Sequence, residues 1–215
     1  MDTKTIKEQV IEGVRFITSH DLVAGTAGNV SIIDRDTNIV YITPTSFPYD
    51  QMTPDDVVGI TLDGEVVDGK HVPSSEWLLH TQIYKAYDHV GAIAHTHSAY
   101  ATSFAVSSEP IPFILIEMTK SMGGDVPVAK FGMPATDEVG KEAVKVLKDR
   151  NACLLESHGA VAVGADLPQA CQRASILEEI AKVYHYAKLN GHVRLIPEED
   201  KQFMLDRAKG KIHAR

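Results

Sequence analysis

The spacing of apolar and polar positions predicts a helix followed by short strands in the first third of the chain. Apolar residues recur every three or four positions over residues 3–20, with charged residues on the opposite face, which is typical of an amphipathic helix. Residues 29–33 and 39–43 are predicted to be two strands of a meander, and the polar residues 34–38 between them indicate a hairpin turn. The Asp63-Gly64 pair predicts a second tight hairpin.

Apolar strands and helical patterns are interspersed through the rest of the chain. We predict strands at residues 90–98 and 152–156, with 161–163 continuing extended, and a strand-like apolar run at 111–116. Helices are predicted at about residues 74–87, 99–106, 136–148 and 167–189, with a short helix after Pro197. From its length we expect one α/β domain, residues 1–215, with the tail after about residue 197 peripheral. Because the hairpins disfavour a purely parallel sheet, this domain should contain a largely antiparallel mixed sheet flanked by helices.

Composition narrows the classes of function. The chain has 215 residues, of which 44% are hydrophobic and 23% charged, as in ordinary globular proteins. A net charge of −8 offers no electrostatic attraction to nucleic acid or an anionic membrane, so neither is predicted as a partner. The polar N-terminus and the lack of any apolar run near 18 residues predict a cytoplasmic location. Cys153 and Cys171 lie in apolar and helical patterns and are predicted to be buried thiols.

Two histidines at the end of the apolar run 90–98 are the first candidate for chemistry. Successive side chains of a strand alternate between its faces, so His95 and His97 should point the same way and could share a divalent cation. His158 stands at the end of another predicted strand, beside a glycine. With Glu76 these residues would form a shell suited to Zn²⁺, with Mn²⁺ or Co²⁺ as alternatives. His80 is the competing ligand, although we expect it and the remaining histidines to lie on the surface: residues 20, 71, 89, 185, 192 and 213.

Glycines and hydroxyl side chains near strand and helix starts are the second candidate. The segment 25–29 (Gly-Thr-Ala-Gly-Asn) is either a plain turn or a loop whose backbone approaches an anion. Ser74 or Ser75 could cap the following helix, and Glu76 suits its first turn. The same helix end could instead bind an anion.

Five motifs together resemble the class II aldolase/adducin family in order and spacing. They are Gly25-Thr-Ala-Gly-Asn-Val-Ser31, Thr43-Pro-Thr45, Pro73-Ser-Ser-Glu76, His95-Thr-His97-Ser98 and Ser157-His158-Gly159. The resemblance covers roughly residues 4–189. It implies a three-layer α/β/α fold and a homotetramer with sites near subunit boundaries.

The resemblance also implies the role of each site residue. His95, His97 and His158 would be metal ligands, and Glu76 would be both a ligand and the acid–base group. The cradle for a substrate phosphate would comprise Thr26, Gly28, Asn29, Thr45, Ser46, Ser74 and Ser75.

The reaction implied is metal-dependent, reversible cleavage of a ketose 1-phosphate to dihydroxyacetone phosphate and a short aldehyde. The bound cation would act as a Lewis acid for the ene-diolate formed as the C3–C4 bond breaks. Glu76 could then protonate that carbanion. L-fuculose 1-phosphate and a deoxypentulose 1-phosphate are both expected substrates.

One position departs from the pattern of the fuculose-phosphate aldolases. They carry a tyrosine, in the segment after Ile-Pro, that reaches into a neighbouring subunit's site. Ile116 and Glu117 stand there instead, so Glu117 is predicted to be the second catalytic proton carrier. The departure leaves the aldehyde half of the substrate open.

The same residues disfavour the alternative activities. The ribulose-phosphate 4-epimerases use an aspartate where Lys120 stands, and the methylthioribulose-phosphate dehydratases lack a ligand like Glu76. A Schiff-base aldolase would need a buried lysine, but neither Lys120 nor Lys130 lies in an apolar run. Adducin-like interaction modules have lost metal residues that persist here. Metal-dependent aldol cleavage therefore remains the main prediction.

Overall fold

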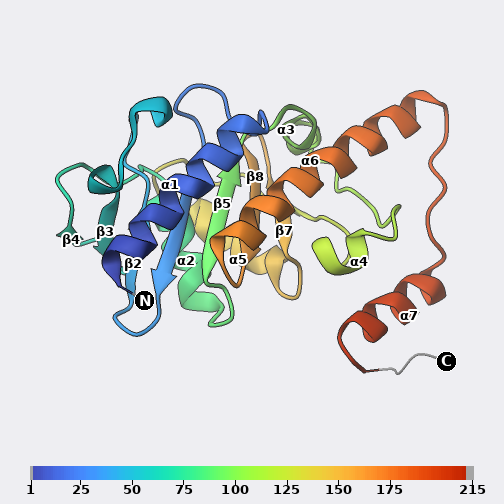
Figure 1. Ribbon diagram of the computed structural model, residues 1–215. Coiled ribbons are helices and arrows are strands. Elements are labelled where there is room, and N and C mark those ends of the chain that lie inside the picture. The colour runs from blue at the N-terminus through green and yellow to red at the C-terminus, as the bar shows by residue number, and fades with distance from the viewer. Residues whose placement is uncertain (1, 212–215) are drawn as a thin grey trace.

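The computed structural model describes residues 2–211, and in them eight strands form one sheet (Figure 1). The strand order is β4-β3-β2-β1-β5-β8-β7-β6. Only β6 and β7 pair in parallel, so the predicted largely antiparallel mixed sheet is confirmed. The strands are β1 (Asn29–Asp34), β2 (Ile39–Ile42), β3 (Val58–Thr61), β4 (Val66–Asp68), β5 (Ala92–Thr96), β6 (Val128–Ala129), β7 (Ala152–Leu155) and β8 (Gly159–Gly164).

Helices cover both faces of this sheet, which confirms the three-layer α/β/α arrangement (Figure 1). The helices α1 and α6 pack on one face, and α2 and α5 pack together on the other. A separate cluster of buried apolar residues fills each layer boundary. The helices are α1 (Thr3–Ser19), α2 (Trp77–Ala86), α3 (Ala99–Val106), α4 (Met118–Ser121), α5 (Asp137–Leu147), α6 (Leu167–Leu189) and α7 (Glu198–Ala208), with 3₁₀ turns η1 (Tyr49–Gln51) and η2 (Pro54–Asp56).

The helix α1 forms where the apolar spacing predicts it. The Asp2 carboxylate accepts a hydrogen bond from the Thr5 backbone N–H at 2.9 Å, which caps the first turn. Asp21, just after the helix, has φ 54°, so the chain turns sharply toward β1. The stripe that α1 buries against the sheet consists of Ile6, Val10, Ile11, Gly13, Val14 and Ile17.

Two local predictions were wrong. The N-cap of α2 is Glu76 rather than Ser74 or Ser75, and no side-chain hydrogen bond caps that helix. Residues 111–116 form no strand, because prolines at 110 and 112 lack the N–H groups that a strand ladder needs. Only Ile111 bridges to Val126. The segment instead leads into the short helix α4, with Glu117 at its N-cap.

The last helix, α7, lies away from the sheet and packs against α4 (Figure 1). Lys201 forms an ion pair with Asp125 at 3.0 Å, and Leu205 is the one buried residue of the helix. The last residues of the predicted tail, 212–215, lie outside the described residues. Among the residues described, no helix is both long enough and apolar enough to cross a membrane.

Candidate metal centre

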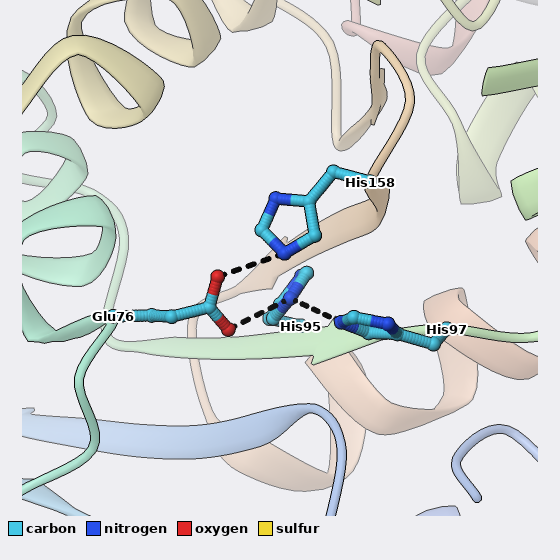
Figure 2. A group of neighbouring side chains, drawn as sticks. All are labelled: Glu76, His95, His97 and His158. Atoms are coloured by element: carbon cyan, nitrogen blue, oxygen red, sulfur yellow. Dashed lines mark hydrogen bonds and ion pairs between the residues drawn. The ribbon is translucent and has the colours of Figure 1, made fainter. Parts of the chain in front are cut away.

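Four side chains from distant parts of the chain meet at one end of the sheet. Glu76 comes from the start of α2, His95 from β5, His97 from just beyond β5, and His158 from the turn between β7 and β8. Figure 2 shows the carboxylate and the three imidazoles directed at one another. One ligand atom from each lies within 4.8 Å of all the others. The structure thus brings together all four residues that the sequence predicted as metal ligands.

Backbone geometry places these imidazoles. The rings of His95 and His97 lie on one side of the chain, with centroids 4.7 Å apart, as their alternation along a strand predicts. His158 follows Ser157, whose φ of 57° is in the left-handed region and turns the chain sharply at the end of β7. A Cβ at Gly159 would clash with the Thr96 carbonyl oxygen, which is backbone of the strand that carries His95. Glycine therefore lets the start of β8 pack directly on β5 beside the two rings.

The facing atoms are close enough to share one ion. Glu76 Oε2 lies 3.0 Å from His95 Nε2, and Glu76 Oε1 lies 2.9 Å from His158 Nε2. The Nε2 atoms of His95 and His97 are 2.9 Å apart. Tetrahedral Zn²⁺ with bonds of about 2.0–2.1 Å would separate its ligand atoms by about 3.4 Å. Three imidazole nitrogens and one carboxylate oxygen at this spacing fit a divalent metal such as zinc.

Hydrogen bonds outside the cluster orient two of these groups. His95 Nδ1 donates to the Ala160 carbonyl at 2.9 Å, which directs Nε2 toward the cluster. The Asn29 side-chain amide donates to Glu76 Oε2 at 2.8 Å. His95 is fully buried, whereas the Glu76 and His158 side chains are 16% and 17% exposed. The cluster is therefore held from the protein side and reached by solvent from the other.

The charges of the cluster are strongly coupled. Burial alone would raise the pKa of Glu76, but His95 and His158 outweigh it and hold that pKa far below its ordinary value. Burial opposes charge on His95, yet the adjacent Glu76 carboxylate raises the pKa of that imidazole. Burial, His95 and His158 lower the pKa of His97 to about 4, so His97 is neutral at pH 7 and its nitrogen can act as a ligand.

A cavity of about 270 Å³ opens beside the cluster, and Glu76, His97 and His158 form part of its wall. All seven residues predicted to bind phosphate also line it: Thr26, Gly28, Asn29, Thr45, Ser46, Ser74 and Ser75. The hydroxyl, amide and backbone groups of this wall suit an anion next to the four residues that could hold a metal. The sequence analysis missed Pro134 and Ala135, which complete the wall from the loop before α5.

Gly28 fixes the shape of this wall. Its φ is +72°, and a Cβ there would lie 2.6 Å from Val23 Cγ1 and 2.7 Å from the His95 carbonyl oxygen. The buried Tyr49 hydroxyl donates to the Gly28 carbonyl at 2.6 Å. The glycine therefore lets the loop pack directly on the strand that carries His95.

Glu117, the second predicted catalytic residue, does not border this cavity. It is exposed and lines a different cavity, of about 780 Å³, between α4, α6 and α7. The residues of the metal cluster are not among those that line this second cavity. The chain therefore does not bring Glu117 together with the other predicted catalytic residue, Glu76.

The expectation that His80 lies on the surface was wrong. His80 is completely buried, on the side of α2 that faces β1. Of the other histidines, His20, His89 and His192 are exposed, while His71 and His185 are half-buried; His213 lies outside the described residues. Cys153 and Cys171 are buried free thiols, as predicted, and burial raises the pKa of each to about 12.

Comparison with known proteins agrees with this geometry. A family model described as "Class II Aldolase and Adducin N-terminal domain" matches residues 8–185. The chain is 31% identical over 204 residues to 5-deoxy-D-ribulose 1-phosphate aldolase of Bacillus thuringiensis serovar kurstaki, covering 95% of each protein. It is 33% identical to an L-fuculose phosphate aldolase of Escherichia coli O6:H1, covering 86% of this chain and 84% of the relative. A solved L-fuculose 1-phosphate aldolase superposes with TM-score 0.91 at 34% identity, covering 95% of this chain and 96% of the other.

Proposed function

The chain belongs to the class II aldolase and adducin family, and from that membership we propose a metal-dependent aldolase that reversibly cleaves a ketose 1-phosphate. The products are dihydroxyacetone phosphate and a short aldehyde. The observation that carries the proposal is that one cavity is bordered both by side chains that could hold a metal and by the hydroxyl and amide groups of the anion cradle.

Glu76, His95, His97 and His158 would hold the cation, which we propose to be Zn²⁺. When bound, the cation supplies a Lewis acid that lowers the energy of the negative charge developing as the C3–C4 bond breaks. The imidazoles contribute neutral ligands, so the carboxylate is the one anionic ligand of the set. This leaves the centre net positive and favours an anionic transition state.

The cradle holds the substrate phosphate without a cluster of lysines. Thr26, Thr45, Ser46, Ser74 and Ser75 offer hydroxyl donors, and Asn29 offers an amide N–H. Gly28 allows the backbone to approach the anion closely. Binding at this end fixes the reacting carbons beside the metal ligands, which lowers the entropic part of the barrier.

Glu76 is proposed to carry the proton that converts the ene-diolate to dihydroxyacetone phosphate. Its carboxylate borders the cavity and is partly exposed to it, whereas His95 is fully enclosed. A carboxylate in this position can exchange its contacts with the imidazoles for a contact with the substrate carbon. Proton transfer of this kind contributes about 10²- to 10⁴-fold to a rate.

Assembly and the second proton carrier complete the proposal. We propose a homotetramer in which Glu117 of one subunit serves a neighbouring subunit's cavity, because Glu117 is exposed and apart from its own subunit's cluster. Ile116, beside it, is 72% exposed, which suits a contact between subunits. A deoxypentulose 1-phosphate and L-fuculose 1-phosphate are the proposed substrates, after the activities for which the relatives are named.

The test is incubation of Zn²⁺-loaded protein with a panel of ketose 1-phosphates, and with ketose 5-phosphates as controls, with coupled detection of dihydroxyacetone phosphate. We expect release from at least one 1-phosphate and none from the 5-phosphates. Epimerisation releases no dihydroxyacetone phosphate, so a new sugar without this product would contradict the proposal.

A further inference from the structure

A chain of short hydrogen bonds runs from Glu76 into the core, through residues of β1 and α2. Asn29 Nδ2 contacts Glu76 Oε2 at 2.8 Å, and Asn29 Oδ1 contacts His80 Nε2 at 2.5 Å. His80 Nδ1 contacts the Ser31 hydroxyl at 2.6 Å, and that hydroxyl contacts the Tyr84 hydroxyl at 2.7 Å. Every polar atom of the His80 side chain is thereby paired.

The direction of each bond follows from the carboxylate. An ionised Glu76 only accepts, so the Asn29 nitrogen must face it and the Asn29 oxygen must face His80. His80 must then donate from Nε2, which leaves Nδ1 to accept the Ser31 proton. The single proton of the Tyr84 hydroxyl lies between two acceptors, the Ser31 hydroxyl oxygen at 2.7 Å and the Ser31 carbonyl at 3.0 Å. From Ser31 through His80 to Asn29, each donor points toward Glu76.

Burial makes the arrangement costly to break. His80, Ser31 and Tyr84 have no exposed surface, and Asn29 is 3% exposed. Burial is the main cause that lowers the pKa of His80 to about 3, so its ring stays neutral and carries a single proton. A buried amide without its partner would lose a hydrogen bond that solvent cannot replace.

Asn29 links this path to the anion cradle, because it also lines the cavity. Its oxygen is held by His80, and one of its two N–H groups is held by Glu76. The second N–H is the remaining donor for an anion in the cavity. With the amide reversed, its oxygen would face the Glu76 carboxylate and the nitrogen would be turned toward His80, so both functions depend on one orientation.

We propose that His80 is a positioning residue: its Nε2–H holds the Asn29 amide in the orientation that supports Glu76 and the bound phosphate together. The expected effect on catalysis rests on the proposed function. We predict that loss of the His80 donor impairs turnover and phosphate binding, although the hydrogen-bond partners of His80 are Asn29 and Ser31 and it does not line the cavity.

The kinetic test compares three variants of the Zn²⁺-loaded protein. His80→Leu keeps a side chain of moderate size but removes the donor, and His80→Gln restores a donor nitrogen at a similar reach. Thr81→Val removes a buried hydroxyl from the next position of the same helix and serves as the matched control. We expect His80→Leu to lower kcat about 10- to 100-fold. Inorganic phosphate, measured by calorimetry, should bind about 10-fold more weakly.

The pattern across the variants decides between positioning and simple support of the core. His80→Gln should recover both quantities to within about 5-fold of wild type, and Thr81→Val should leave both within about 2-fold. A folded His80→Leu variant with wild-type kcat and wild-type phosphate affinity would overturn the proposal. Equal losses in Thr81→Val would also overturn it, because any weakening of α2 would then suffice.

A second measurement needs neither activity nor a variant that folds. In ¹⁵N-histidine spectra of the wild-type protein, His80 should be the tautomer protonated at Nε2, unchanged between pH 5.5 and 8.5. The tautomer protonated at Nδ1 would reverse the donor chain and refute the inference. The wild-type protein could release no dihydroxyacetone phosphate and still show the expected tautomer and the expected loss of phosphate affinity in His80→Leu. That result would refute the aldolase proposal and leave the positioning role of His80 in place.

Discussion

Replacing Gly28 by alanine tests how the proposed phosphate cradle and the proposed metal ligands are joined. A non-glycine residue at φ +72° costs about 1–2 kcal/mol in backbone conformation. The new Cβ would lie 2.7 Å from the His95 carbonyl oxygen, and ordinary contact needs roughly half an ångström more. Val23, at 2.6 Å, is a side chain that can move, but the His95 backbone cannot move without shifting a proposed metal ligand. We expect a total loss of about 2–4 kcal/mol in the free energy of unfolding.

Gly25→Ala provides the matched control. Gly25 lies in the same loop with φ +61°, yet a Cβ there meets nothing within 4 Å. This variant should lose only the conformational part, about 1–2 kcal/mol, and keep its bound metal. Urea denaturation, metal content after dialysis and kcat/KM for dihydroxyacetone phosphate release should be measured on both variants. If Gly28→Ala matched Gly25→Ala in stability and metal retention, the close contact between the loop and the His95 backbone would contribute neither to stability nor to metal binding, and the reasoning would be refuted.

Three further substitutions test separate parts of the account. Glu76→Gln should keep part of the bound metal but lower kcat about 10²- to 10⁴-fold, as measured by coupled assay; a wild-type rate would remove its role in proton transfer. Glu117→Gln should slow cleavage about 10-fold or more while dihydroxyacetone phosphate still binds, and unchanged kinetics would leave that residue structural. Asp56→Asn should lower the free energy of unfolding at pH 7 by about 1–3 kcal/mol. Burial opposes the Asp56 charge, but hydrogen bonds from Thr53 and His71 outweigh it and hold the pKa of Asp56 below its ordinary value. Its stabilising effect is therefore fully present above the ordinary carboxyl pKa and is lost as the pH falls through the lowered pKa, so denaturation curves for variant and wild type should converge in acid.

Short-range patterns predicted most of the fold. The apolar spacing of residues 3–20 and the tight turn at Asp63-Gly64 are encoded within a few residues, and both appear in the structure. Alternation along a strand was enough to place His95 and His97 on one side. Joining them to Glu76 and His158 required the family resemblance, because nothing local to those positions records how the strands are ordered.

The errors arose where long-range packing decides the environment. His80 follows Glu76 by one helical turn in a polar-looking segment, and its burial depends on Asn29 and Ser31, about 50 positions earlier in the chain. The loop that brings Pro134 and Ala135 to the cavity carries no periodic signal. Tertiary contacts overrode local appearance at each of these places.

Metal titration is the most direct test of the central claim, that Glu76 and three histidines hold one catalytic cation beside a phosphate cradle. Metal-free protein should be titrated with Zn²⁺ while bound metal and dihydroxyacetone phosphate release are recorded together, with His95→Ala in parallel. We predict that both rise in step to one ion per subunit in the wild type and that neither rises in the variant. Full cleavage by metal-free wild type, or an undiminished response in His95→Ala, would contradict the account.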